Sequence, residues 1–163
     1  MLFRSTPRPL PSPRDTIGAG REAVDREPAP RRLSPSSVVE SALRFRGVPY
    51  RNGGADPKGF DCSGFTRHIF ELSVGLVLPR RADEQAQMPG LLSVNRDDLK
   101  PGDLVFFNTL RHTFSHVGIY IGDNKFIHSP KPGQEVQIQD MRQAYWDRRF
   151  TGARRVKSPN VEQ

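Results

Sequence analysis

A chain of 163 residues has room for one domain with a modest core and some additional sequence. Its hydrophobic fraction of 35% is low for a compact domain, so we expect part of the chain not to fold, and its single cysteine excludes an internal disulfide. The net charge of +7 indicates attraction to an anionic partner, whether nucleic acid, a membrane surface or an acidic cell-wall polymer.

Neither a membrane span nor a signal peptide is recognisable in the sequence. No apolar run approaches the ~20 residues that a membrane-spanning helix needs. The first seven residues include a basic residue that no apolar stretch follows, unlike a signal peptide. We therefore expect either that the protein is not exported by that route or that the start of the natural chain is missing here.

Residues 1–33 are rich in proline and arginine and have almost no periodic apolar residues. Seven arginines stand against four acidic residues there, which gives the segment a net charge of +3. Such a composition cannot bury enough surface to offset the entropy lost on folding. We expect a disordered tail or linker over 1–33, a folded domain over 34–157 and a disordered C-terminal tail over 158–163. A solvated linker fits the first tail better than a tether to an anionic surface.

The folded part should open with a helix at Ser34-Pro35, because serine caps helices and proline suits the first helical turn. Apolar residues recur at helical spacing as far as Phe45, and Gly47 marks the expected end. A glycine-rich loop over 48–59 follows. Residues 78–87 predict a further short, polar helix.

The only cysteine, Cys62, stands in the heptapeptide Gly59-Phe60-Asp61-Cys62-Ser63-Gly64-Phe65. Asp61 and Ser63 are good capping residues, and the apolar residues from Phe65 to Leu72 fit one face of a helix. Cys62 would then lie at or near a helix N-terminus, where unpaired N–H groups and the macrodipole make a thiol easier to ionise. From this segment alone, a catalytic nucleophile and a buried structural cysteine are equally well supported.

The second half of the chain predicts a succession of short strands. They are expected at residues 104–107, 116–121, 125–128, 135–138 and 150–156, with a short helix at 140–146. Helices followed by such a succession predict an α+β domain with a mainly antiparallel sheet.

Two histidines of this sheet, His116 and His128, are candidates for the base that a cysteine nucleophile needs. If residues 122–124 form the loop between their strands, His128 lies opposite Gly118, on the same face as His116 and diagonal to it. A two-residue loop at 123–124 would move His128 to the other face. The catalytic interpretation therefore requires the three-residue loop. Taken singly, each histidine fits a half-buried structural role better.

The remaining polar residues suggest no metal or nucleic-acid site. His68 lies six residues after Cys62, which predicts a solvated side chain facing away from it, and His112 falls in a loop. A lone cysteine without paired Cys-x-x-Cys or His-Glu-x-x-His spacing argues against zinc, so we expect no metal and no cofactor. The basic residues lack the interleaved aromatic residues of a nucleic-acid-binding module, so no nucleic acid is expected either.

Six stretches of the sequence, taken in order, resemble the NlpC/P60 cysteine peptidases, which are related in layout to papain and act on bacterial cell-wall peptides. The stretches are residues 47–54, 60–65, 78–80, 99–107, 116–122 and 126–128. They extend over nearly all of the foldable chain. The resemblance implies a papain-like NlpC/P60 fold, in which N-terminal helices pack on a mainly antiparallel β-sheet.

The resemblance also implies roles for individual residues. Cys62 matches the nucleophile, His116 the general base, and His128 the third polar residue that holds the His116 ring. Tyr50 matches a tyrosine whose hydroxyl lies beside the nucleophile and helps the backbone N–H of Cys62 to hold the developing oxyanion.

Asp61 and Ser63 match residues that shape the substrate side of the cleft, a role that is compatible with helix capping. The sequence departs from the family after Leu78-Pro79-Arg80, where Arg81-Ala82 replace a small polar pair. This departure leaves the substrate preference open.

The implied function is a thiol endopeptidase that hydrolyses an amide bond in the peptide stems of bacterial peptidoglycan, typically between D-glutamate and the diamino acid. Its implied place is periplasmic or extracellular, at the cell wall, and we expect a monomer. One alternative is an amidase, an acyltransferase or a delivered wall-degrading effector on the same fold, because motifs identify chemistry better than biology. The other is a non-catalytic binding module, which the presence of Cys62 and His116 disfavours.

Overall fold

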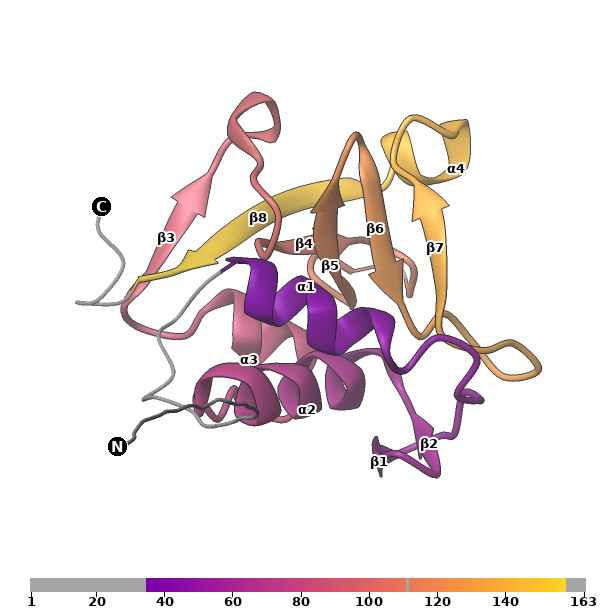
Figure 1. Cartoon of the computed structure of the whole chain (residues 1–163). Coiled ribbons are helices and arrows are strands. Elements are labelled where there is room, and N and C mark those ends of the chain that lie inside the picture. The colour runs from indigo at the N-terminus through magenta and orange to yellow at the C-terminus, as the bar shows by residue number, and fades with distance from the viewer. Residues whose placement is uncertain (1–34, 111, 158–163) are drawn as a thin grey trace, which may run out of the picture. The chain divides into compact units, whose positions relative to one another are not determined.

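The computed structural model describes residues 35–110 and 112–157 (Figure 1). The predictions for residues 1–33 and 158–163, and for Ser34 as a helix cap, lie outside the described residues. The elements in chain order are α1 (Pro35–Leu43), β1 (Ala55–Asp56), β2 (Gly59–Phe60), α2 (Cys62–Val74), α3 (Ala82–Ala86), β3 (Leu91–Val94), the 3₁₀ helix η1 (Arg96–Asp98), β4 (Leu104–Phe107), β5 (His116–Gly122), β6 (Lys125–His128), β7 (Gln137–Asp140), α4 (Ala144–Asp147) and β8 (Phe150–Val156).

Six strands form one antiparallel sheet in the order β3-β8-β4-β5-β6-β7, and β1 and β2 form a separate small hairpin. The helices α1 and α2 lie side by side against one face of this sheet, whereas α4 lies at its other side, above β6 and β7 in the view of Figure 1. The predicted α+β class and the mainly antiparallel sheet are therefore confirmed.

The two faces of the sheet carry two separate hydrophobic clusters. Leu104 and Phe106 of β4 pack toward the helices, while Val105 and Phe107 of the same strand pack on the opposite face with Trp146 of α4. Because both faces are covered, β4 is a continuous apolar run rather than an alternating one. This arrangement explains why four consecutive apolar residues form a buried strand.

Several elements differ from the prediction in their limits. The first helix ends at Leu43 rather than near Gly47, because the amides of Phe45 and Arg46 bond to carbonyls three residues earlier, as in a tightened last turn. In the strand predicted at 135–138, Val136 bonds to the backbone of Val48 instead of joining a ladder, so β7 begins two residues later, at Gln137.

Three regions have more or less regular structure than the sequence predicted. The loop over 48–59 contains the β1–β2 hairpin, and the helix predicted at 140–146 is confined to α4. Strand β3 was not predicted at all. Its side chains are all partly exposed, so no alternation of apolar residues marks it, and it is held by backbone pairing with β8.

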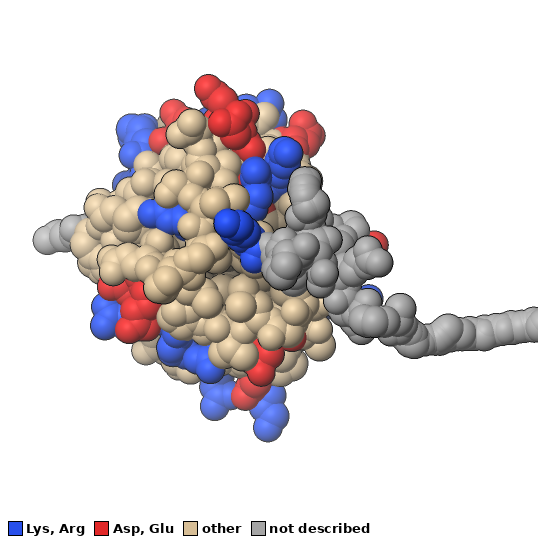
Figure 2. Space-filling view, turned by 90° about the vertical axis from the view of Figure 1, so that its left-hand side faces the viewer, with Lys and Arg blue, Asp and Glu red and all other residues tan. Residues whose placement is uncertain are grey.

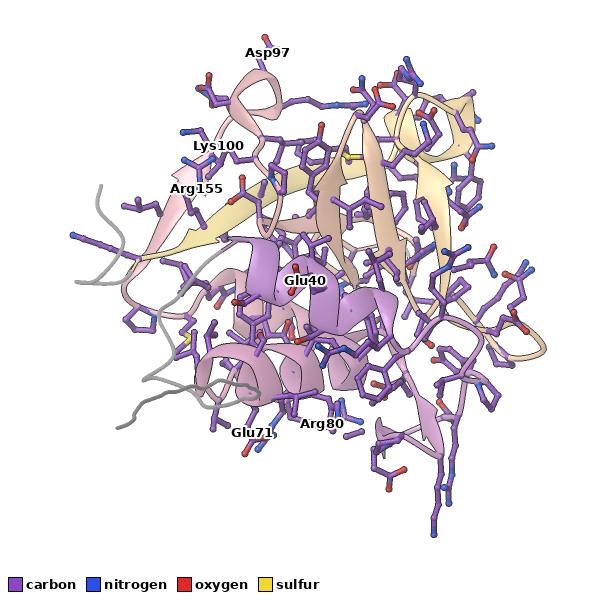
Figure 3. All side chains as sticks on the ribbon, viewed as in Figure 1. Glu40, Glu71, Arg80, Asp97, Lys100 and Arg155 are labelled. Carbon is purple, nitrogen blue, oxygen red and sulfur yellow. The ribbon has the colours of Figure 1, made fainter. Side chains whose placement is uncertain are left out.

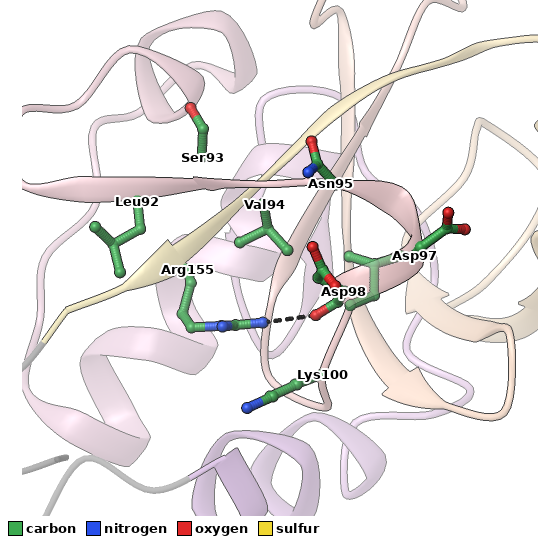
Figure 4. A pocket seen from close by; sticks show the side chains of 9 residues that line it. Leu92, Ser93, Val94, Asn95, Asp97, Asp98, Lys100 and Arg155 are labelled. Atoms are coloured by element: carbon green, nitrogen blue, oxygen red, sulfur yellow. Dashed lines mark hydrogen bonds between the residues drawn. The ribbon is translucent and has the colours of Figure 1, made fainter. Parts of the chain in front are cut away.

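An ion pair between a partly exposed arginine and a buried aspartate joins the end of β8 to the turn before β4. Arg155 donates two hydrogen bonds of 2.9 Å to the Asp103 carboxylate, which is 2% exposed, and one to the carbonyl of Asp98. Arg155 also lines a hollow of about 510 Å³ with residues of β3 and η1 (Figure 4). The bonds to Asp103 and Asp98 account for the position of Arg155. None of the predicted site residues lines this hollow.

On the face shown in Figure 2, acidic and basic side chains lie interspersed among uncharged residues. No helix among the described residues is long and apolar enough to cross a membrane.

Candidate active site

Cys62 is the first residue of α2, where the sequence predicted it. Asp61 is the N-cap: its backbone is extended, and its Oδ1 accepts a hydrogen bond of 2.7 Å from the Gly64 amide. A Cβ at position 64 would collide with the Gly54 carbonyl oxygen, so glycine there lets the preceding loop approach the first turn of the helix. The helix N-terminus thus holds Cys62 in one defined position.

Arg80 links the two polar residues that flank Cys62. It donates to both carboxylate oxygens of Asp61, at 3.1 and 2.9 Å, and to the Ser63 hydroxyl at 3.0 Å. Figure 3 shows Arg80 beside α2, and about a third of its side chain is exposed. Ser63 therefore does not cap the helix, and Arg80 is a site residue to which the sequence analysis assigned no role, although the motif Leu78-Pro79-Arg80 contained it.

His116 and His128 lie on one face of the sheet in direct contact. Nε2 of His116 and Nδ1 of His128 are 2.7 Å apart, and the two side chains are 4% and 0% exposed. The indole of Trp146 stacks on the His116 ring at 5.5 Å between centroids, and Phe107 packs beside it. The predicted pairing of the histidines is therefore confirmed.

The hairpin that aligns them is not the one that was predicted. Gly122 pairs with Lys125, so the turn has only two residues, Asp123 and Asn124, both with positive φ. The register shifts by one residue at Ile121, in the manner of a β-bulge. That extra residue restores the pairing expected from a three-residue loop, and His128 stays on the face of His116.

Two further side chains adjoin the histidine pair, and neither was predicted. Oε1 of Gln139, on β7, lies 2.6 Å from Nε2 of His128. Trp146 comes from α4, which the strand pattern could not place. Both contacts join elements that are distant in sequence, so no local signal could have found them.

The cysteine and the histidine pair meet at the start of β5. The backbone amide of Val117, the residue after His116, lies near enough to the Cys62 sulfur to lower the pKa of the thiol. Burial raises the pKa of the Tyr50 hydroxyl, and the nearby Cys62 and Asp61 raise it further, which places Tyr50 beside them. The structure therefore places Tyr50, Asp61 and Ser63 near Cys62, and Cys62 near the start of the strand that carries His116.

The Cys62 thiol is harder to ionise than the sequence predicted. Burial raises the pKa of Cys62 to about 11, although the N–H groups of Val117 and Ser63 lower it. Burial also lowers the pKa of His116 to about 4 and holds that of His128 well below its usual value. The expectation of an easily ionised thiol is wrong for the free protein, because desolvation outweighs the helix N-terminus. The Cys62 thiol and the His116 imidazole are therefore both neutral near pH 7.

The other two histidines lie elsewhere. The ring of His68 is half-buried, with the rings of Phe45 and Phe60 each 5.3 Å away between centroids, so the prediction of a solvated side chain is wrong. His112 is exposed and contacts the Thr113 carbonyl. Within residues 35–110 and 112–157, no three His, Cys, Asp or Glu side chains are grouped so as to hold a metal ion.

Comparison with known proteins identifies the family of the chain. The NlpC/P60 family profile matches residues 47–155, which contain every residue of the site. The chain belongs to the NlpC/P60 family. Members of this family of solved structure share the fold: an NlpC/P60 family protein from Bacillus cereus ATCC 10987 superposes with a TM-score of 0.70 at 34% identity, covering 76% of this chain and 40% of that one.

Two relatives show the range of NlpC/P60 proteins that the chain resembles. Murein DD-endopeptidase MepH of Escherichia coli (strain K12) is 47% identical over 126 residues, which are 76% of this chain and 46% of MepH. Gamma-D-glutamyl-L-lysine dipeptidyl-peptidase of Bacillus subtilis (strain 168) is 37% identical over 123 residues, 74% of this chain and 40% of that protein. The chain thus spans less than half the length of either relative.

The buried neutral histidines predict a loss of stability in mild acid. Histidines of the unfolded chain bind protons below about pH 6.5, whereas folded His116 does so only near pH 4. The unfolded state therefore binds more protons between these values, and stability falls as the pH falls. From His116 alone we expect a loss of about 2 kcal/mol between pH 7 and pH 5.

Urea unfolding at the two pH values measures this loss. The variant His116→Gln should lose much of the pH dependence, and His68→Gln, which alters a half-exposed ring, should retain it. An equal pH dependence in wild type and His116→Gln would contradict the assignment of a buried, neutral His116.

Proposed function

We propose that this domain is a thiol hydrolase in which Cys62 is the nucleophile, His116 the general base and His128 the residue that holds the His116 ring. The observation that carries the proposal is the meeting of a helix-terminal cysteine with the start of β5, where the 2.7 Å histidine pair lies. A nucleophile, a base and a third polar group that orients the base form the arrangement used in covalent acyl transfer.

Because Cys62 and His116 are both neutral before the reaction, the thiol must lose its proton during the attack on the substrate. As Sγ of Cys62 attacks the carbonyl carbon, Nδ1 of His116 takes the thiol proton, and the negative charge passes to the former carbonyl oxygen. The C–N bond then breaks, and His116 returns the proton to the leaving amine, which leaves a thioester on Cys62. Water hydrolyses the thioester, with His116 accepting its proton and returning it to the sulfur.

The oxyanion of the tetrahedral intermediate needs hydrogen-bond donors beside the sulfur. We assign this role to the backbone N–H of Cys62, at the N-terminus of α2, and to the Tyr50 hydroxyl. Burial raises the pKa of Tyr50, so its hydroxyl keeps the proton that it would donate. The position of Tyr50 near Cys62 and Asp61 supports this role.

Asp61 and Ser63 are assigned to the substrate side of the cleft. Their ties to Arg80 hold the carboxylate and the hydroxyl in place on either side of the nucleophile. A held carboxylate next to a partly exposed guanidinium offers both a negative and a positive group to a charged peptide.

The proposed substrate is the peptide stem of bacterial peptidoglycan, and the proposed place of action is the cell wall. Family membership and the names of both relatives support this substrate. The bond between D-glutamate and the diamino acid fits the dipeptidyl-peptidase. The more similar MepH is a DD-endopeptidase, which favours a second candidate, a bond between two D-configured centres.

Digestion of purified stem peptides and cross-linked muropeptides, read by mass spectrometry, tests the proposal and separates the two bonds. Wild type should release new fragments whose masses identify the bond, and Cys62→Ala should release none. Products that carry an acyl group transferred to an amine would instead support the acyltransferase alternative. Identical digests from both proteins would refute the thiol-hydrolase proposal.

A further inference from the structure

The proposed mechanism needs the lone pair of His116 on Nδ1, and the structure contains a group that can place it there. We propose that Gln139 is a positioning residue that sets the tautomer of His128, and through it the tautomer of His116, so that Nδ1 of His116 is free to accept a proton. This inference rests on the proposed function, since it concerns the base of the same reaction.

Three side chains from three adjacent strands form an unbroken chain of hydrogen bonds. His116 of β5 contacts His128 of β6 at 2.7 Å, and His128 contacts Gln139 of β7 at 2.6 Å. Gln139 pairs with Phe126 across the ladder and so lies diagonal to His128 on the same face. The sheet register therefore places each of these groups.

The contact between His128 and Gln139 determines the donor and the acceptor of each hydrogen bond in this series. The Gln139 oxygen has no proton, so Nε2 of His128 must be the donor. A neutral imidazole has one N–H, which makes Nδ1 of His128 an acceptor. Nε2 of His116 must then donate to it, and the lone pair of His116 stays on Nδ1.

Tautomers matter here because both rings are neutral. The two histidines are almost fully buried, and the rings that pack on them are those of Phe107, Phe126 and Trp146. In the other tautomer, His116 would present an N–H to the thiol and could not accept its proton. Once His116 has taken the proton, its Nε2–H still bonds to His128. The hydrogen bonds between His116, His128 and Gln139 therefore do not have to change during the reaction.

The test variants at Gln139 and the control variant at Gln137 all lie on β7. Gln139→Leu removes the acceptor, Gln139→Asn withdraws it by one methylene, and Gln139→Glu keeps an oxygen that can only accept. Gln137→Leu makes the same change two residues earlier, on the same face and directly opposite His128. The side chain of Gln137 bonds to Gln134 and the Glu135 carbonyl rather than to either histidine, which makes it the control.

Two measurements need no peptide substrate. The ¹⁵N shifts of the imidazoles in histidine-labelled protein report the tautomer, and the rate of Cys62 alkylation by iodoacetamide at pH 7 reports the ability of His116 to accept the proton. We expect the Nε2–H tautomer on both histidines in wild type, Gln137→Leu and Gln139→Glu. Gln139→Leu and Gln139→Asn should show mixed tautomers and about tenfold slower alkylation.

Two results would overturn the inference. One is an Nδ1–H tautomer on His116 in the wild type, and the other is an unchanged tautomer and alkylation rate in Gln139→Leu or Gln139→Asn. A purely structural role for Gln139 would alter stability without moving the tautomer. If wild type cleaved no stem peptide, the proposed function would fail while these measurements still decided the role of Gln139.

Discussion

Replacing His116 with alanine or glutamine should lower kcat/KM for stem-peptide hydrolysis by about 10³–10⁴-fold at pH 7. The reason is the protonation state of the free site. With a pKa of about 11, only ~10⁻⁴ of the Cys62 thiol is ionised at pH 7. The reaction in the variant would depend on that small fraction.

The pH dependence provides the control for this prediction. Alkylation of Cys62 in His116→Gln should be slow at pH 7 and should rise about tenfold per pH unit toward pH 11, because the thiol itself is intact. Glutamine also fills the space beside Trp146, so a loss in both variants is not explained by a cavity. More than a tenth of wild-type kcat/KM in His116→Gln would contradict the assignment of His116 as the base.

Gly118→Ala should have the second largest effect, although Gly118 takes no part in the chemistry. A Cβ there would lie 2.8 Å from the Phe126 ring, 3.0 Å from Cβ of His128 and 3.0 Å from the Ile127 carbonyl. Each of these neighbours is fully buried, so His128 would have to move away from His116. We expect kcat/KM to fall about 10²-fold and stability by about 1–3 kcal/mol.

A variant with a matched loss of stability distinguishes misalignment from weak folding. Val105 pairs directly with Gly118 across β4 and β5, and Val105→Ala should cost a similar amount of stability through a cavity. Activity of Val105→Ala should stay within a few-fold of wild type at a temperature where both variants are folded. Equal losses of activity in the two variants would show that Gly118 matters for stability alone.

The elements that carry the site could be predicted where local chemistry decides them. Strands β4 and β6 have the predicted limits, because short apolar runs between turn residues admit few alternatives. The position of Cys62 followed from the capping preference of Asp61. The histidine pair was predicted from a loop that proved one residue too long, and the register shift at Ile121 made up the difference.

What could not be predicted depends on packing between distant segments. Arg80 reaches the site from the loop before α3, Gln139 from β7 and Trp146 from α4, and no local pattern in the sequence predicts these contacts. The protonation of Cys62 was predicted wrongly for a related reason. A helix N-terminus is visible in sequence, whereas the burial that outweighs it appears only in the folded protein.

A covalent intermediate on Cys62 is the central claim, and intact-protein mass spectrometry after rapid acid quench tests it most directly. With a stem peptide as substrate, the wild type should gain the mass of the acyl fragment during turnover. Peptide mapping should place that mass on Cys62, and Cys62→Ala should gain none. Release of product by Cys62→Ala, or an acyl group found on another residue, would contradict the account.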